Sequence, residues 1–287
     1  MNARTSPPTL RWAAVLAAGL AAAGCHRATP AERSAEPILE KNASARGGLA
    51  AWKAVRSMSM AGRLDAGVPR DPVKLAQSYQ RTSAAAKAEV RRALARHEAD
   101  AEKPVQLPFV LEMERPRKTH LAIEFQGKTA VQVYDGEKGW KLRPFLGRHE
   151  VEPFTAEELR IAAQQSDLDG VLLDSEAKGS RVALLASEPV EGRDAYKLEV
   201  TSRDGQVRHV WVDAQTYLEV KIDGTRKIDG KLRPVWTALR DYRAEGGLMV
   251  PHLLETTVEG MRGAERIVVD RVALNPKLDG ARFSRPD

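Results

Sequence analysis

The sequence predicts a mainly β fold of the α+β class, built around one strongly curved antiparallel sheet. From residue 58 onward, apolar and polar residues alternate with a period of two, so one face of each strand is apolar and the other is polar. Dipeptides that favour tight turns bound these runs, among them Gln126-Gly127, Asp135-Gly136 and Asp223-Gly224. Short strands at close spacing indicate an antiparallel meander rather than a βαβ sheet.

The chain begins with a segment typical of an export signal. Arg4 and Arg11 supply positive charge, residues 12–23 are uncharged and apolar, and small residues lead to Cys25, the only cysteine. Residues 1–24 resemble a bacterial lipoprotein signal, in which the cysteine after the cleavage site carries the lipid and becomes the new N-terminus. The alternative is an ordinary secretory signal in which Cys25 falls by chance. Either signal takes the mature chain out of the cytoplasm.

The composition disfavours several functions. Lys and Arg number 45 against 39 Asp and Glu, and the mature chain keeps 43 of these basic residues because Arg4 and Arg11 leave with the signal. This small excess, outside the cytoplasm and without a basic-aromatic motif, disfavours a nucleic-acid partner. With Cys25 lipidated, no thiol is left for a disulfide, so burial alone must stabilise the fold.

Two regions follow the signal. Residues 25–36 are rich in Ala, Arg, Glu, Pro and Ser, which indicates a lipidated N-terminus and a flexible tether. Residues 37–287 are predicted to form a single domain, which starts with a helix over residues 37–55 that Gly47-Gly48 interrupts. The apolar stripe of this helix consists of Ile38, Leu39, Leu49, Trp52 and Val55.

Strand-like alternation then recurs in many short runs. Their apolar-face members include Phe109, Leu111 and Met113; Leu121, Ile123 and Phe125; Val131 and Val133; Tyr196, Leu198 and Val200; Val207, His209 and Trp211; Leu218, Val220 and Ile222; Leu248, Val250 and Leu254; and Ile267 and Val269. Residues 70–104 lack this pattern, and their Ala-rich centre predicts a helical insertion, with a charged loop as the alternative. Thr155 and Glu158 form a capping box, which predicts a short helix over residues 155–164.

Four segments spread over nearly the whole mature chain carry a family resemblance. They are Ala45-Arg46-Gly47-Gly48-Leu49 with the strand after it, Tyr134-Asp135-Gly136-Glu137-Lys138-Gly139-Trp140, the run from Val210 to Leu218, and the run from Leu278 to Ser284. Together they resemble the LolA/LolB-like family of periplasmic lipoprotein-sorting carriers. The resemblance implies an unclosed β-barrel with a helical lid, which holds acyl chains between the concave sheet and the lid. The insertion at about 70–104 departs from the family's compact first hairpin.

Catalytic motifs are absent from the sequence. It contains no Gly-x-Ser-x-Gly elbow, no His-Glu-x-x-His pair and no glycine-rich phosphate loop. The histidines are scattered without the spacing that metal ligands need. We therefore expect a protein that is not an enzyme and that needs no metal and no cofactor.

The apolar face of the sheet is the candidate functional surface. In a closed small barrel such side chains fill the interior, whereas in an open one they line a ligand cavity. The candidate cavity residues are Leu121, Ile123, Val133, Leu198, Val200, Trp211, Leu218 and Val220. Trp140, Trp211 and Trp236 are candidates for its walls, although each also suits a structural core.

Two functions follow from these expectations. The first is a lipid-anchored envelope protein that binds the acyl chains of a lipid or lipoprotein for transfer or sensing, at the outer membrane and facing the periplasm. The alternative is a structural or regulatory envelope protein with a filled barrel that binds a protein partner. An enzyme is the least favoured class, because no nucleophile-base pair is apparent.

Overall fold

The computed structural model describes residues 34–65, 105–144, 148–228, 231–261 and 263–286. The predicted signal, Cys25, most of the tether and nearly all of the 70–104 insertion lie outside these residues. Within them the helices are α1 (Glu36–Ala45), α2 (Leu49–Ala54) and α5 (Ala156–Gln165), with a 3-10 helix η3 (Gly280–Phe283) near the C-terminus.

Thirteen strands make up most of the remaining described chain. They are β1 (Ser57–Asp65), β2 (Gln106–Glu114), β3 (Lys118–Phe125), β4 (Lys128–Tyr134), β5 (Gly139–Arg143), β6 (Arg148–Pro153), β7 (Arg181–Val190), β8 (Arg193–Thr201), β9 (Val207–Asp213), β10 (Glu219–Ile228), β11 (Lys231–Glu245), β12 (Leu248–Val258) and β13 (Glu265–Leu274).

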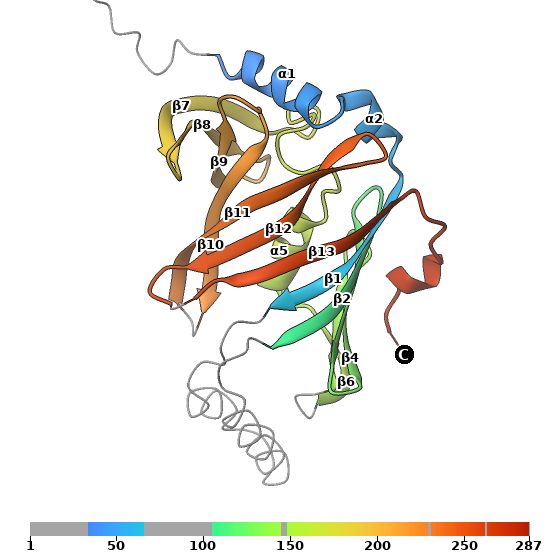
Figure 1. The fold of residues 1–287 in the computed structure, drawn as a ribbon. Helices are drawn as coiled ribbons and strands as arrows, with labels where there is room; N and C mark the ends of the chain where they lie inside the picture. The colour runs from blue at the N-terminus through green and yellow to red at the C-terminus, as the bar shows by residue number, and fades with distance from the viewer. Residues whose placement is uncertain (1–33, 66–104, 145–147, 229–230, 262, 287) are drawn as a thin grey trace, which may run out of the picture.

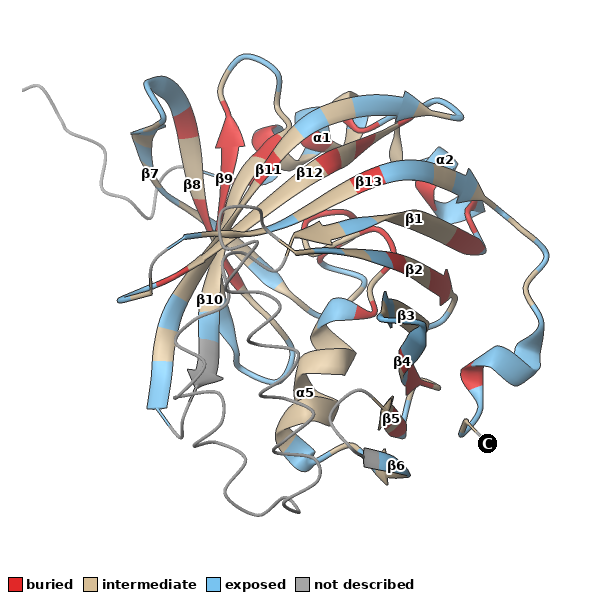
Figure 2. Ribbon diagram, turned by 60° about the horizontal axis from the view of Figure 1, so that its bottom comes forward, coloured by how far each residue is buried: buried red, intermediate tan, exposed pale blue. Residues whose placement is uncertain are grey.

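All of these strands belong to one antiparallel sheet. Its order is β6-β5-β4-β3-β2-β1-β13-β12-β11-β10-β9-β8-β7, so β1 and β13 are the only neighbours that are not consecutive along the described strands. The strands β6 and β7 end the order and leave the sheet open, and the sheet curves strongly about its own axis (Figures 1 and 2). The predicted mainly β, unclosed antiparallel architecture is confirmed.

The helices form where local sequence chemistry favours them. Helix α1 ends before Gly47 and Gly48, which both adopt positive φ angles, and α2 begins directly after them. A Cβ atom on Gly47 would lie 2.4 Å from the carbonyl oxygen of Gly247, so only glycine allows this close approach to the β11–β12 turn. Helix α5 begins with the predicted capping box, in which the Thr155 side chain accepts from the Glu158 amide.

The core lies at one end of the curved sheet, beneath α1 and α2. Residues 166–180, here called the plug, connect α5 to β7 and fill the space between these helices and the sheet. One buried cluster joins Trp52 of α2 and Leu173 of the plug to Met58 and Met113 of the sheet. A second cluster joins α1 and the plug to β8 and β9; its buried members are Ala35, Ile38, Leu172, Leu198, Val200, Val210 and Val212.

The structure differs from the sequence-based expectation in β10 and in four strands that were not expected, β5, β6, β7 and β11. Asp223-Gly224 is not a turn but lies inside β10, where both residues pair with β11. The Asp223 carboxylate also accepts from the His209 amide at 2.5 Å, so the preference of an Asp-Gly pair for a turn is overridden by cross-strand bonds. The strands β7 and β11 were not expected, because their half-exposed residues mix polar and apolar types on both faces.

Candidate functional site

The concave face of the sheet carries two apolar rows that cross several strands. Directly opposite residues in an antiparallel pair share a face, so the strand register identifies these rows. The first row consists of Leu239, Leu254, Ile267, Leu64 and Leu107, from β11 to β2. The second row consists of Val272, Met60, Leu111 and Leu121, from β13 to β3, and Phe109 pairs with Ile123 beside it.

Burial along this face is uneven, and Phe109 and Leu239 are 8% and 9% exposed. Met58 and Met113, which contact the plug cluster, are 2% and 5% exposed. Further along the same face, Leu64, Leu107 and Ile123 are only half-buried. The concave face therefore has a sealed end and an end where apolar side chains remain partly in contact with solvent.

Helix α5 lies across this face. Leu121 pairs with Gln132, which in turn pairs with Lys141, so these three side chains share the concave face. The Lys141 Nζ atom donates to Glu158 of α5 at 2.5 Å, which places the helix over the concave side of the sheet, as Figure 2 shows. Burial raises the pKa of Glu158, but the bonds from Lys141 and Thr155 outweigh that effect and lower it.

Polar contacts hold α5 at both of its ends. Its first turn is tied to β5 by Lys141 and Glu158, and its last turn to β9, where Arg208 donates to Gln164 at 2.9 Å. Arg160 donates to Gln206 before β9 at 3.1 Å. None of the ten residues of α5 is buried. The helix thus bridges two distant strands of the sheet without being packed into a core.

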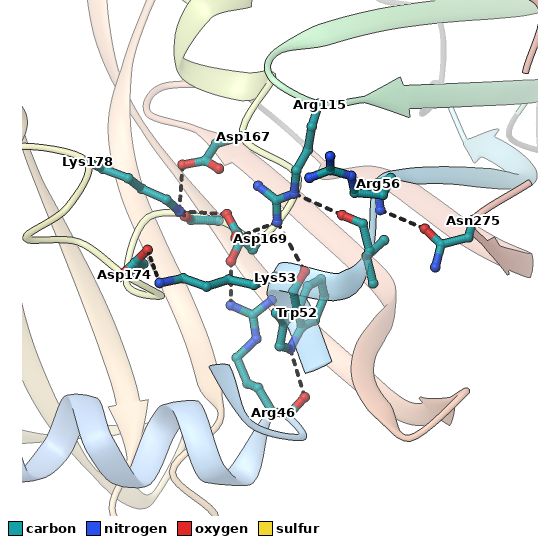
Figure 3. Close-up of polar contacts among 12 residues, drawn as sticks. Arg46, Trp52, Lys53, Arg56, Arg115, Asp167, Asp169, Asp174, Lys178 and Asn275 are labelled. Atoms are coloured by element: carbon teal, nitrogen blue, oxygen red, sulfur yellow. Dashed lines mark hydrogen bonds and ion pairs between the residues drawn. The ribbon is translucent and has the colours of Figure 1, made fainter. Parts of the chain in front are cut away.

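Ion pairs anchor the plug at the sealed end (Figure 3). Asp169, which is 3% exposed, accepts from Arg115 at 2.7 Å and from Lys178 at 2.6 Å. Arg115 lies in the turn between β2 and β3 and also donates to the carbonyl oxygens of Val55 and Trp52 at 2.9 and 3.2 Å. One guanidinium thereby connects the plug, the sheet and α2.

A second buried arginine connects the plug to the helices. Arg46 follows α1 and donates to the Asp169 carbonyl oxygen at 2.9 Å, while its Nη1 atom lies 3.4 Å from Glu219 Oε1. Its guanidinium also lies over the Trp52 ring, 4.5 Å from the ring centroid, and the Trp52 indole donates back to the Arg46 carbonyl oxygen. The plug is therefore held by buried charge as well as by apolar packing.

The two plug carboxylates Asp167 and Asp169 have opposite pKa shifts. Burial, together with the hydrogen bond to Asp169, raises the pKa of Asp167 to about 6. Burial acts in the same direction on Asp169, but hydrogen bonds from Asp167, Lys178 and Arg115 outweigh it and lower the pKa of Asp169. At neutral pH the Asp169 charge is thus stabilised by its partners, whereas the Asp167 charge carries a cost.

Two clefts open on other parts of the surface. One, of about 560 Å³, adjoins Arg115 and is lined by Arg56, Ser57, Glu114, Arg115 and Pro116. The other, of about 380 Å³, lies on the outer face, with Trp211, Val220, Lys221 and Trp236 among its lining residues. Neither cleft is lined by the concave apolar rows. In the described part of the chain, no group of three His, Cys, Asp or Glu side chains could hold a metal ion, and no helix is long and apolar enough to cross a membrane.

The eight predicted cavity residues do not converge on one face. Leu121 and Ile123 lie on the concave face near α5, as their register shows. Leu198 and Val200 share that face but are 0% and 2% exposed in the core beneath α1. Whether any of the four contacts a ligand stays a prediction.

The other four predicted residues lie elsewhere. Val133 faces outward with Trp140 and His120, on the side of β3 and β4 that η3 covers. Trp211 pairs with Lys221 on the outer face, and Val220 lines the same outer cleft because the register shifts between Glu219 and Lys221. Leu218 lies in the turn before β10, where its carbonyl oxygen accepts from Asp213. The bulge at Val220 breaks the simple alternation from which these residues were predicted.

Sequence reasoning also missed residues of the candidate site. Leu64, Leu107 and Leu254 belong to the concave rows and show the expected period of two, but only the strand register aligns them. Arg115 and Asp169 are isolated charges in the sequence, and no local pattern marks them as a pair 54 residues apart.

The arrangement of sheet and helices matches solved structures. A LolA superfamily protein from Nitrosomonas europaea superposes with a TM-score of 0.56 at 14% sequence identity, over 88% of this chain and 98% of that protein. The chain has a LolA-like fold. A DUF1329 family protein from Desulfovibrio piger also superposes on this chain, with a TM-score of 0.53 at 12% identity, over 87% and 96% of the two chains.

A third solved structure has a similar arrangement. A domain from Vibrio parahaemolyticus, assigned to outer membrane lipoprotein sorting, matches with a TM-score of 0.50 at 12% identity, over 87% of this chain and 97% of that one. No family model matches the sequence, and no curated protein is similar enough in sequence to match it. At these identities the likeness establishes the fold.

Proposed function

We propose that this protein binds the acyl chain of a lipid or an acylated lipoprotein on its concave face, beneath α5, in the bacterial envelope. The observation that carries the proposal is a pair of apolar rows, half-buried except at Leu239, opposite a helix with no buried residue. An acyl chain laid along these rows gains about 0.8 kcal/mol for each buried CH₂ group. Such binding needs few polar partners and no catalytic group.

The fold and the sequence support the same role. A LolA-like fold is also found in a domain assigned to lipoprotein sorting, which is a binding role rather than a catalytic one. The signal that ends at Gly24-Cys25 supports lipid attachment at Cys25, and with it a location at the outer membrane facing the periplasm. The ligand is then taken up from, or delivered to, a membrane to which the protein itself is anchored.

A second candidate function is supported by the sealed end of the concave face. The plug fills this end so completely that Leu198 and Val210 are 0% exposed. A barrel filled along its whole length has no room for an acyl chain and would leave binding of a protein partner as the function.

One pair of variants separates the two functions. Ile123→Glu places a carboxylate among the half-buried concave residues, whereas Ala122→Glu places it on the opposite face of the same strand. Uptake of a fluorescent fatty acid by the purified protein should fall about tenfold or more in Ile123→Glu and stay unchanged in Ala122→Glu. Thermal melting checks that both variants are folded.

Two results would contradict the binding of an acyl chain on the concave face. Absence of fatty-acid uptake by the unmodified protein, with no lipid seen by native mass spectrometry after extraction from its own membrane, would favour the filled barrel. Equal uptake by both variants would place the ligand away from the concave face.

A further inference from the structure

Arg208, a cation without an ion-pair partner among the described residues, lies on the concave face between β9 and α5. Arg208 pairs with Val200, a residue of the buried core, so its side chain points to the concave side. There it donates to the Gln164 side chain in the last turn of α5 at 2.9 Å. Arg208 thus occupies the side of the sheet on which we place the acyl chain.

The hydrogen-bonding capacity of this pair is largely unused within the described structure. A guanidinium has five N–H donors, and the described residues supply Arg208 with one acceptor, the Gln164 Oε1 atom. None of the described carboxylates lies within ion-pair distance of it; Asp204 and Asp223 act on it only at longer range. The Nε2 atom of Gln164 is buried and has no described partner either.

The two side chains have different deficits: the Gln164 Nε2 donor is buried without a described acceptor, and Arg208 is a half-buried charge without an ion-pair partner among the described residues. Burial lowers the pKa of Arg208, which is the sign of a guanidinium partly withdrawn from water. Buried donors without acceptors, and buried charges without partners, each destabilise a fold. An anion that accepts from both side chains would give the buried Gln164 Nε2 atom an acceptor and Arg208 a counter-ion, and a planar guanidinium suits a carboxylate or phosphate.

The neighbouring residues are apolar. Two residues after Arg208, Val210 faces the same side and pairs with Leu198 and Ile222. Because Val210 and Leu198 are buried in the core on the plug side, the hydrocarbon of an amphiphile must lie toward the half-buried concave rows, with its charged end at Arg208.

We infer that Arg208 and Gln164 form a subsite for the anionic group, a carboxylate or a phosphate, of an amphiphile whose acyl chain lies on the concave face. The inference rests on the proposed function and specifies its ligand as an acidic lipid. Because Gln164 belongs to α5, the bound anion also ties this helix to β9.

The test compares an acid with its neutral analogue in the full protein. A fluorescent fatty acid should bind about tenfold or more tightly than its methyl ester, since hydrogen bonds to charged groups contribute about 1.5–3 kcal/mol. Arg208→Met should remove this preference and leave methyl-ester affinity unchanged. Arg203→Met, which removes an exposed arginine from the β8–β9 turn, is the matched control and should keep the preference.

A second variant keeps the test decisive if Arg208→Met fails to fold. Gln164→Glu supplies Arg208 with an internal carboxylate, so the protein should be at least as stable in thermal melting and should lose the preference for the acid. Retention of the preference in Arg208→Met or in Gln164→Glu would overturn the subsite.

Two further outcomes separate this inference from its premise. Equal binding of acid and ester by the unmodified protein would overturn the subsite but leave acyl-chain binding intact. Binding of neither ligand would overturn the proposed function and the subsite together. Inorganic phosphate, titrated alone by calorimetry, should bind far more weakly than the lipid; binding of equal strength would show that the site takes a free anion instead.

Discussion

Arg115 and Asp169 form a 2.7 Å ion pair that joins the β2–β3 turn to the plug, although 54 residues separate them in the sequence. Asp169 is 3% exposed, and Lys178 is its second cationic partner. Arg115 also donates to carbonyl oxygens at the end of α2, so this one side chain fixes three parts of the sealed end. Movement of the plug out of the half-barrel requires this pair to break.

Arg115→Met is expected to destabilise the protein by about 3 kcal/mol, because it leaves the buried Asp169 carboxylate with one of its two cationic partners. Lys53→Met is the control: it breaks the ion pair with Asp174, but Lys53 is 53% exposed and the expected loss is below about 1 kcal/mol. Urea unfolding of both variants measures the difference. Equal losses would mean that Arg115 does not hold the plug.

Asp167 should make stability depend on pH. The pKa of Asp167 rises from 3.8 in the unfolded chain to about 6 in the folded protein. The protonated Asp167 therefore stabilises the fold fully below pH 3.8, and this stabilisation is lost as the pH rises through 6. Asp167→Asn should therefore be more stable than the unmodified protein at pH 7.5, by roughly 1–2 kcal/mol after allowance for its partial exposure. The advantage should shrink toward pH 4; an advantage independent of pH would contradict the shift.

Alanine substitutions at Gly47 and Gly48 distinguish the cost of backbone strain from the cost of a steric clash. Both have positive φ angles, but a Cβ atom on Gly48 meets nothing within 4 Å, whereas one on Gly47 meets the Gly247 carbonyl oxygen. Gly48→Ala should cost about 1–2 kcal/mol through strain alone, and Gly47→Ala clearly more. Chemical denaturation of the two alanine variants tests the order, and a reversed order would place the α1–α2 link away from the β11–β12 turn.

Thr155→Ala should loosen α5 without unfolding the protein. Loss of the N-cap bond destabilises a helix by about 1 kcal/mol, and α5 contributes no buried residue to the core. Amide hydrogen exchange across α5 should therefore accelerate about fivefold while the melting temperature hardly changes. Thr225→Ala, at an exposed position in β10, is the control and should alter neither. A large drop in melting temperature would show that α5 is part of the folding core.

Cys25 should carry the lipid. Cys25→Ser should leave an unprocessed precursor that metabolic labelling with palmitate does not mark, because serine offers no thiol for the lipid. Undiminished labelling of this variant would instead support an ordinary secretory signal.

Local patterns predicted the elements whose formation depends on nearby residues. The capping box at Thr155 and Glu158 was recognisable because both of its bonds lie within one helical turn. The interrupted first helix was recognisable because two glycines in succession end a helix whatever surrounds them. The meander itself followed from alternation and from glycine-containing turns such as Gln126-Gly127, which both adopt positive φ.

The candidate site was less predictable. Alternation shows which residues of one strand share a face, but it does not show which residues of different strands lie on the same face of the sheet. Val133 and Leu121 both belong to alternating runs, yet they point to opposite sides once β3 and β4 are paired. A single bulge at Val220 then moves that residue to the outer cleft. Register and bulges arise from hydrogen bonds between strands, which the sequence of one strand does not contain.

The sequence by itself predicted an export signal, and it determined that most of the described chain forms one antiparallel sheet with an apolar face and that a capped helix interrupts the strands. These properties follow from residue type and spacing over a few positions. The tertiary structure decided how the sheet curves, which end of its concave face the plug seals, and where Arg115, Asp169, Arg208 and Gln164 meet. Those contacts join residues 44 and 54 positions apart, and only packing of the whole sheet around α5 and the plug brings them together.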